Sequence, residues 1–272
     1  MTERLRSVAR RLIYRPLFRA VGGRLRPRAV VLLYHRIGEP AVDPHGQAVA
    51  PATFASHLEM LRSRYTVLPL PDLLDRLPGR AFPDGTVAVT FDDGYADNLT
   101  AAWPVATRLG VPFTVFVTVQ PVLGGRPFRW DEREDQGRPL TVAELRELAA
   151  LPGVGIGAHT MTHPRLASLS TGEQRRELAE GRERLAELTG QPVDLLAYPF
   201  GKPGDLALET PRLAEEAGYR AAFSSQAGRI IPSSPRYLLP RLSVHDWPDG
   251  ELSRRLEECF DPPARTRRGN GP

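Results

Sequence analysis

The sequence predicts an α/β fold in which parallel strands alternate with helices, arranged as one layered sheet or as a barrel. From residue 29 onward, short apolar runs alternate with amphipathic segments of helical length, a pattern typical of successive βα units. The chain has 272 residues, of which 41% are hydrophobic, so it can bury a sizeable core. Polar residues follow several of the apolar runs, as active-site residues do at one rim of a parallel barrel.

Strands are expected where the apolar runs are short, rich in β-branched residues and bounded by turn residues. They cover residues 30–34, 86–91, 112–118, 154–158, 195–198, 220–224 and 238–244. Helices are expected between them, at residues 53–64, 98–109, 141–150, 170–189 and 211–217. Two of these helices should begin with a capping box, in which Thr141 pairs with Glu144 and Ser170 pairs with Glu173.

Charge is unevenly distributed along the chain. Residues 1–28 carry nine arginines and one acidic residue, and residues 261–272 carry three arginines and one acidic residue. Residues 29–260 hold 24 basic and 30 acidic residues. We therefore expect a basic N-terminal arm (1–28), one mildly acidic domain (29–260) and a disordered basic tail (261–272). Nucleic-acid binding needs basic and aromatic residues interleaved on one face. That pattern is absent, so no nucleic-acid partner is expected.

The N-terminal arm has two interpretations. Four of its apolar residues fall at helical spacing among the arginines, namely Leu5, Val8, Leu12 and Ile13. The arm could therefore lie on an anionic membrane surface, or it could pack on the domain with its basic face in solvent. It lacks the apolar core and cleavage site of a secretory signal, and the chain has no run of eighteen apolar residues. The single cysteine, Cys259, fits a reducing compartment. We expect a cytoplasmic protein, with membrane contact through the arm as an open alternative.

Two polar motifs come directly after expected strands. Asp92 and Asp93 precede Gly94 at the end of one strand, and His159 and His163 follow another. Because the carboxyl ends of parallel strands share one rim, we expect the two motifs to lie close together. One Asp and two His with an open position match a hydrolytic metal site, and the second carboxylate can take a proton from the metal's water. Either motif alone has a simpler explanation, since Asp-Asp-Gly is also a common turn sequence. Their joint position at strand ends favours the metal site.

The motifs resemble those of the polysaccharide deacetylases, carbohydrate esterase family 4. Residues 90–94 (Thr-Phe-Asp-Asp-Gly) resemble the first family motif, and residues 159–163 resemble the second, His-Ser/Thr-x-x-His. Residues 197–201 (Ala-Tyr-Pro-Phe-Gly) are similar to the third motif in the branch with Tyr-Pro-Phe/Tyr-Gly, and residues 33–36 and 140–164 also resemble that branch. The resemblance covers nearly the whole domain. It implies a distorted (β/α) barrel with fewer than eight regular strands.

The resemblance also implies an activity, the metal-dependent removal of N- or O-acetyl groups from a carbohydrate. In this family pattern Asp93, His159 and His163 would hold a divalent metal, usually zinc, with Co²⁺, Mn²⁺ or Ni²⁺ as alternatives. Asp92 would be the general base that deprotonates the metal-bound water. The main-chain N–H of Tyr198, together with the metal, would stabilise the tetrahedral oxyanion.

Two positions depart from the common family pattern. The arginine that begins the common third motif and steadies the base is not clearly in place, and Arg241 is the candidate substitute unless it is a surface or core-edge arginine. The fifth motif, Leu-x-His, supplies the general acid, but His245 ends a Leu-x-x-His with one residue too many. In some relatives the acid comes from the N-terminal strand, which favours His35. For either histidine, a hydrogen-bonding role alone remains the alternative. No role is expected for two further histidines, in a loop and on a helix surface: His45 and His57.

The long polar loop after the third expected strand is the expected wall of the substrate groove. It contains Trp130 and Asp131, which resemble the tryptophan-bearing wall of the family, since aromatic rings stack on sugars. Phe200 of the third motif is assigned to the same substrate-binding set. Two alternatives stay open: a deacylase or deformylase of a small or lipid-linked sugar or another acylated amine, and a non-catalytic sugar-binding relative. The sequence motifs of serine hydrolases and of His-Glu-x-x-His zinc proteases are absent.

Overall fold

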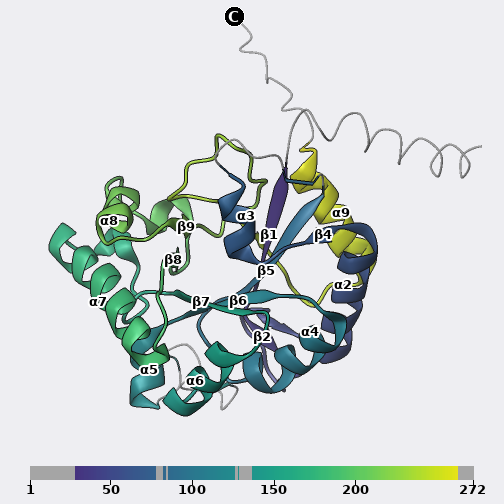
Figure 1. Ribbon diagram of the computed structural model, residues 1–272, viewed down its shortest axis with the longest axis horizontal. Coiled ribbons are helices and arrows are strands. Elements are labelled where there is room, and N and C mark those ends of the chain that lie inside the picture. The colour runs from purple at the N-terminus through teal and green to yellow at the C-terminus, as the bar shows by residue number, and fades with distance from the viewer. Residues whose placement is uncertain (1–27, 78–81, 84, 126–127, 129–136, 263–272) are drawn as a thin grey trace, which may run out of the picture.

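The computed structural model describes residues 28–77, 82–83, 85–125, 128 and 137–262. Its centre is a curled parallel sheet in the order β10-β1-β5-β6-β7-β8-β9, with β4 paired to β5 off this path (Figure 1). The strands are β1 (Ala29–Tyr34), β4 (Thr66–Val67), β5 (Thr86–Phe91), β6 (Phe113–Val117), β7 (Val154–Ala158), β8 (Leu195–Ala197), β9 (Ala221–Phe223) and β10 (Leu242–Ser243). The predicted α/β class and the distorted parallel barrel are confirmed.

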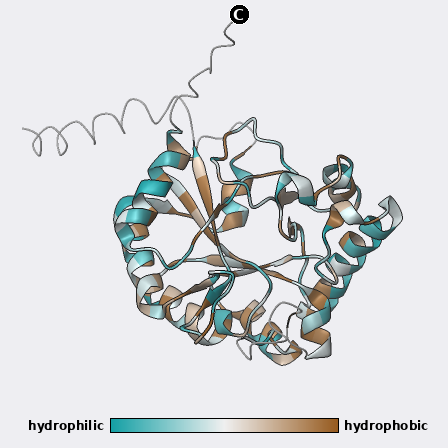
Figure 2. Cartoon of the chain, turned by 180° about the vertical axis from the view of Figure 1, so that it is seen from behind, coloured by the Kyte–Doolittle hydropathy of each residue, from teal (hydrophilic) through white to brown (hydrophobic). Residues whose placement is uncertain are grey.

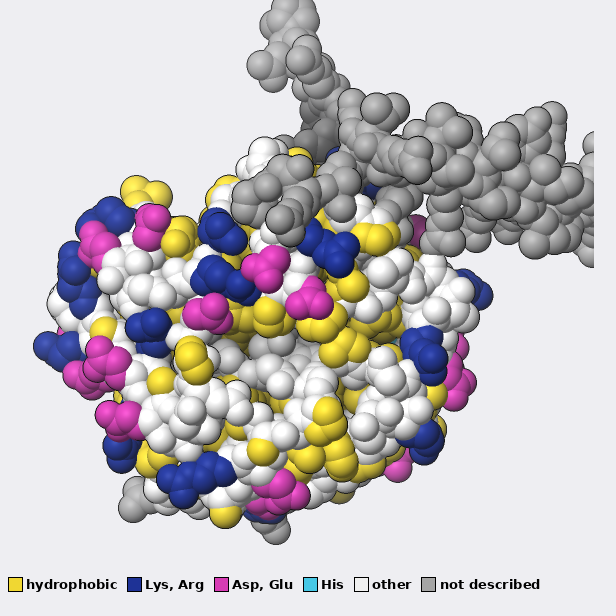
Figure 3. Space-filling view, viewed as in Figure 1, with side chains coloured by type: hydrophobic (Ala, Val, Ile, Leu, Met, Phe, Trp, Pro, Cys, Tyr) yellow, Lys and Arg dark blue, Asp and Glu magenta, His cyan; other side chains and the backbone are white. Residues whose placement is uncertain are grey.

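Helices surround the curled sheet, with their apolar residues toward it (Figures 1 and 2). They are α2 (Pro51–Arg64), α3 (Leu70–Asp75), α4 (Trp103–Leu109), α5 (Val119–Gly124), α6 (Val142–Ala150), α7 (Thr171–Thr189), α8 (Thr210–Glu216) and α9 (Asp249–Phe260). Short turns of other helix types are η1 (Asn98–Ala102), η2 (Leu166–Ser168) and η3 (Pro203–Asp205), and β2 (Arg36–Ile37) pairs with β3 (Ala48–Val49). On the face seen in Figure 3, charged side chains lie mainly around the periphery.

The two central strands explain why the polar motifs lie where they do. Every residue of β1 and β5 is buried, because one face of these strands packs against α2 and α4 and the other against α3 and side chains of β6, β8 and β9. Both strands are therefore apolar almost throughout. Their register pairs Ala29 with Thr86 and runs to Tyr34 opposite Phe91. The residues that follow, His35 and Asp92, consequently leave the sheet side by side at the same rim.

The predicted capping boxes are confirmed at the starts of α6 and α7. In both, the N-cap hydroxyl accepts a hydrogen bond from the N–H three residues on, and the glutamate there accepts one in return. Each box satisfies two N–H groups that a helix start would otherwise leave unpaired. The boxes fix where both helices begin, and α7 lies next to the loop that carries the histidine motif.

Several local predictions need correction. The expected strand 238–244 shrinks to two residues in β10, because Pro240 cannot donate a ladder hydrogen bond and only single bridges form before it. The expected helix 98–109 opens with a π-helical turn, η1, since Pro104 lacks the N–H that a regular α-helix would bond to Thr100. The helix α9 was not predicted, although Leu252 and Leu256 already mark its buried face.

The sequence predicts that His57 lies on a helix surface, and this prediction is wrong. The structure shows the residue fully buried. It lies on the face of α2 toward β1 and the loop before α9. Its Nε2 is 2.7 Å from the carbonyl oxygen of Trp247, and its Nδ1 is 3.2 Å from the hydroxyl of Tyr34. Burial lowers the pKa of His57 more than the neighbouring carbonyl and carboxylates raise it, so the ring is neutral and joins three elements.

Some predictions concern residues outside the described part of the chain. The proposed membrane contact of the arm and the disorder of the tail fall largely on residues 1–27 and 263–272, and Trp130 and Asp131 lie in the gap 129–136. Among the helices that the structure does describe, none has the length and apolar character needed to cross a bilayer.

Candidate metal centre and active site

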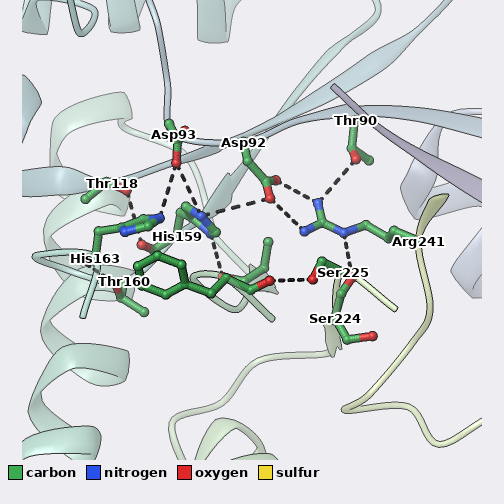
Figure 4. A network of polar contacts seen from close by, with 12 residues as sticks. Thr90, Asp92, Asp93, Thr118, His159, Thr160, His163, Ser224, Ser225 and Arg241 are labelled. Carbon is green, nitrogen blue, oxygen red and sulfur yellow. Dashed lines mark hydrogen bonds and ion pairs between the residues drawn. The ribbon is translucent and has the colours of Figure 1, made fainter. Parts of the chain in front are cut away.

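The two predicted motifs meet at the rim of the sheet. Asp93 follows β5, and His159 and His163 follow β7. The Oδ1 atom of Asp93 is 3.5 Å from Nε2 of His159 and 3.4 Å from Nε2 of His163. One ligand atom from each residue lies within 4.8 Å of the other two, so the three can hold a single metal ion (Figure 4).

The protonation of His159 and Asp93 suits a metal ion. His159 donates a hydrogen bond from Nδ1 to the carbonyl oxygen of Ala197 over 2.8 Å, which leaves Nε2 unprotonated toward Asp93. Burial lowers the pKa of His159 to about 4, so the ring is neutral near pH 7. Burial alone would raise the pKa of Asp93, but the hydrogen bond and charge of His163 reverse this and lower it to about 2. Neutral imidazole and ionised carboxylate are the forms that bind metals.

The loops around this centre hold unusual backbone conformations. Among the described residues, four other than glycine have a left-handed φ, and all belong to the predicted motifs: Asp93 (76°), Thr160 (66°), His163 (61°) and Phe200 (60°). Such conformations cost on the order of 1–3 kcal/mol each and persist only where the surroundings impose them. The site is therefore held in place by its neighbours rather than by local preference.

One neighbour that imposes the histidine loop is Glu177 on α7, which sequence reasoning had missed. Its carboxylate accepts hydrogen bonds from the N–H of Met161 (3.0 Å) and of Thr162 (2.9 Å), and from the Thr162 hydroxyl (2.7 Å). The loop lies directly on the helix at Gly181. A Cβ added at this glycine would come within 2.9 Å of the Thr160 carbonyl carbon. The one feature of the sequence that could have pointed to this contact is that Glu177 lies one helical turn before Gly181.

Replacing Glu177 with Ala should weaken metal binding about tenfold or more, the usual effect of losing a group that orients metal ligands. The loop between the two histidines would lose three hydrogen bonds while both imidazoles remain. Competition for Zn²⁺ with a chromophoric chelator measures the affinity. Glu180→Ala, at an exposed position of the same helix, is the matched control. Equal affinities in the two variants would show that the carboxylate does not hold the loop.

The second aspartate has a different partner. Both oxygens of Asp92 accept hydrogen bonds of 2.7 Å from the guanidinium of Arg241, which is fully buried. The guanidinium also donates to the carbonyl oxygen of Ser224 (3.0 Å) and the Thr90 hydroxyl (3.3 Å), and it lies over the ring of Phe116. The structure therefore places Arg241 beside the predicted base and excludes a surface position for it (Figure 4).

The electrostatics keep Asp92 ionised. Burial raises its pKa, but the charge of Arg241, the largest opposing cause, and the hydrogen bonds of its guanidinium help to hold the pKa below its ordinary value. Its Oδ2 atom is 3.9 Å from Nε2 of His159. One carboxylate of the pair is thus held by an arginine and the other by two histidines, so adjacent residues are prepared for different tasks.

The two candidate acids lie in different surroundings. His35 is half-buried after β1, close enough for its charge to help lower the pKa of both Asp92 and Asp93, although burial and nearer partners act more strongly. His245 is directed toward a loop: its Nδ1 is 2.6 Å from the carbonyl oxygen of Gly46, and its ring contacts Trp247.

The expected role of Tyr198 does not fit its hydrogen bonds. Its main-chain N–H donates to the carbonyl oxygen of Phe223 over 3.0 Å, as part of the pairing between β8 and β9, and its hydroxyl donates to the carbonyl oxygen of Tyr237. This N–H is therefore committed to the sheet and is not an oxyanion donor. Phe200 does reach the centre, since its ring is half-exposed and packs edge-on against His163 at 5.0 Å.

Comparison with known proteins identifies the family. Residues 79–222 match the profile described as polysaccharide deacetylase. Because the match covers more than half of the chain, the protein belongs to the polysaccharide deacetylase family. The branch with a particular third motif is a finer assignment that this match does not make.

Individual relatives agree with the family assignment. YxkH of Bacillus subtilis (strain 168), named for the same family, is 26% identical over 216 residues, which span 79% of this chain and 70% of YxkH. The poly-beta-1,6-N-acetyl-D-glucosamine N-deacetylase of Staphylococcus aureus (strain N315) is 23% identical over 253 residues, or 84% of this chain and 83% of that protein.

Solved structures share the fold. The deacetylase PplD of Streptococcus pyogenes, solved in complex with acetate, aligns with a TM-score of 0.72 at 20% identity and covers 85% of this chain and 99% of PplD. IcaB from Ammonifex degensii aligns with a TM-score of 0.69 at 25% identity, over 84% of this chain and 96% of IcaB. The curled parallel sheet is therefore the fold of this family.

Proposed function

We propose that the protein is a metal-dependent hydrolase that removes acetyl groups from an acetylated carbohydrate. The observation that carries this proposal is the division between two adjacent carboxylates. Asp93 faces two histidines at 3.4 and 3.5 Å, whereas Asp92 is locked by a buried arginine at 2.7 Å. A protein that merely bound a sugar or a metal would not need an ionised base beside the ligand set. The arrangement is that of a hydrolase.

Zinc is the ion that we propose for Asp93, His159 and His163, because two His and one carboxylate with an open position are typical of catalytic zinc sites. Co²⁺, Mn²⁺ and Ni²⁺ remain alternatives for the same donors. When bound there, the ion would polarise the acyl oxygen and lower the pKa of water to about 7.

The protein's own groups would carry the proton transfers. Asp92 accepts a proton from the attacking water, and Arg241 keeps this carboxylate ionised and oriented. His35 donates a proton to the leaving amine or alkoxide as the tetrahedral intermediate collapses. As the donor that stabilises the oxyanion we propose the main-chain N–H of Phe200 instead of that of Tyr198. Phe200 belongs to the same turn, and its ring contacts His163.

The relatives suggest which substrate to test first. The Staphylococcus aureus relative is named for poly-beta-1,6-N-acetyl-D-glucosamine. We also assign residues 198–201 (Tyr-Pro-Phe-Gly) to the branch of the family with that third motif. N-acetylated glucosamine oligomers with β-1,6 linkages are therefore the substrate class that we propose.

The test is acetate release by the zinc-loaded protein from β-1,6-linked N-acetylglucosamine oligomers, O-acetylated sugars, and N-formylated and lipid-linked sugars. We expect one free amine for each acetate from the oligomers, and release about 10²–10⁴-fold slower with Asp92→Asn. Formate release, or acetate from small or lipid-linked sugars alone, would move the function to a deacylase of those substrates. Sugar binding without any hydrolysis would make the protein a non-catalytic relative.

Replacing His35 with Ala should lower turnover of the N-acetylated oligomer about 10²–10⁴-fold, the usual contribution of a positioned proton donor. Bound metal should be unchanged, because His35 is not one of the three ligands. His245→Ala is the matched control and should cost far less, since that ring is bonded to Gly46. The reverse ranking, measured on metal-replete protein, would make His245 the acid.

A further inference from the structure

The chain around His35 is held by side chains rather than by the sheet. The β1–β5 ladder ends where the N–H of Asp92 donates to the carbonyl oxygen of Tyr34 over 2.9 Å. Beyond this point the side-chain amide of Asn98 donates to the carbonyl oxygen of His35 over 3.0 Å. Asn98 thus takes the place of the next strand partner.

Asp97, the residue before Asn98, binds the two residues that follow His35. Asp97 accepts a hydrogen bond from the N–H of Ile37 at Oδ1 (3.2 Å) and another from Nε of Arg36 at Oδ2 (3.1 Å). The amide of Asn98 also donates to Oδ1 of Asp97 over 3.2 Å. Two consecutive side chains therefore hold three consecutive residues, which we call the His35 clamp (Asp97 and Asn98).

Burial makes the clamp specific. Asn98 is fully buried, and its amide nitrogen must face His35, because the carbonyl there can only accept. Asp97 is less buried, with 17% of its side chain exposed, and the burial it has raises its pKa to about 6 although Arg36 opposes this. A buried ion pair adds little net stability once desolvation is counted. The contribution of these contacts lies in the geometry that they impose.

The clamp belongs to the loop that carries the base and a metal ligand. Asp92 and Asp93 precede Asp97 by five and four residues, and η1 begins at Asn98. Two backbone hydrogen bonds join this loop to the segment 138–140. The N–H of Ala96 donates to the carbonyl oxygen of Arg138, and the N–H of Leu140 donates to that of Gly94. One rigid segment thus sets the positions of Asp92, Asp93 and the backbone of His35.

We propose that Asp97 and Asn98 are positioning residues that hold His35 at the correct separation from Asp92 for proton donation to the leaving group. This inference rests on the proposed function, in which His35 is the acid. It assigns no contact with substrate to the clamp. Misplacing a catalytic group by about 1 Å can cost on the order of 10²-fold in rate.

The test uses two substrates that differ in their need for an acid. In an N-acetylated sugar oligomer the leaving group is an amine, which must be protonated as it departs. In 4-nitrophenyl acetate the leaving group is 4-nitrophenolate, which is stable as an anion and needs no acid. Asn98→Leu keeps the volume but removes the amide. It should lower kcat for the oligomer about 10–10²-fold, with KM, bound metal and hydrolysis of the aryl ester retained. Thr100→Ala, exposed on the same π-helical turn, is the control.

Combination with His35→Ala gives a second readout. If the clamp acts through His35, Asn98→Leu should have no further effect on oligomer turnover in that background. Should Asn98→Leu fail to fold, Asp97→Asn keeps the shape, weakens the Arg36 contact and should show the same selective loss.

Each contrary outcome has its own meaning. Equal loss on both substrates, no loss on either, or additive losses with His35→Ala would overturn the clamp. A silent His35→Ala would instead refute the acid assignment. Absence of amide hydrolysis in the unaltered protein would refute the proposed function itself.

Discussion

Changing His159 and His163 together to Ala should remove both bound metal and acetate release. The two rings supply two of the three donor atoms that lie within 4.8 Å of one another, and Asp93 alone is a weak site. Turnover should fall to that of a protein-free control, and Zn²⁺ content, measured by mass spectrometry after dialysis, should fall with it.

The barrel should remain folded in this variant, because both histidines lie in the loop after β7 rather than in the strand. Circular dichroism checks the fold. Single Ala variants at His159, His163 and Asp93 should show the same joint loss. Full metal occupancy in the double variant would refute the assigned ligands.

Asp92→Asn should separate catalysis from metal binding. An amide cannot accept a proton from water near neutral pH, so turnover should drop about 10²–10⁴-fold, while Asp93, His159 and His163 retain the metal. The substitution also leaves the buried Arg241 charge without its partner. Removing one partner of such a pair typically costs about 3–5 kcal/mol, so the free energy of unfolding should fall as well.

Asp93→Asn is the matched control for Asp92→Asn, since the two residues are adjacent and the chemical change is identical. It should weaken metal binding directly, because Asp93 lies against both histidines. Metal titration at a temperature where both variants are folded makes the comparison. Equal metal loss in the two variants would mean that the roles of the aspartates have been divided wrongly.

The predictable parts of this protein are those with local causes. The strand 86–91 was predicted to the residue, because an apolar run ends abruptly at a polar turn. Both capping boxes follow from a Ser or Thr three residues before a Glu. The convergence of Asp93, His159 and His163 was predictable because their motifs end strands of one parallel sheet, whose carboxyl ends share a rim.

The parts that sequence reasoning missed depend on contacts between distant segments. The burial of His57 needs α2 to lie against the loop before α9, and the loss of the Tyr198 N–H needs β9 to pair with β8. Arg241 was named only as a candidate, since its partner Asp92 is 149 residues away. In the sequence Glu177 and Asn98 are indistinguishable from ordinary helix residues. Their roles depend on segments distant in the chain, the histidine loop for Glu177 and the backbone at His35 for Asn98.

The most direct test of the central claim is a titration of metal-stripped protein with Zn²⁺ while acetate release from a β-1,6-linked N-acetylglucosamine oligomer is measured. The account predicts no turnover without metal and a linear rise that levels off at one ion per chain, since one set of three ligands is present among the described residues. Full acetate release from the stripped protein, or none at saturating Zn²⁺, Co²⁺, Mn²⁺ or Ni²⁺, would contradict it.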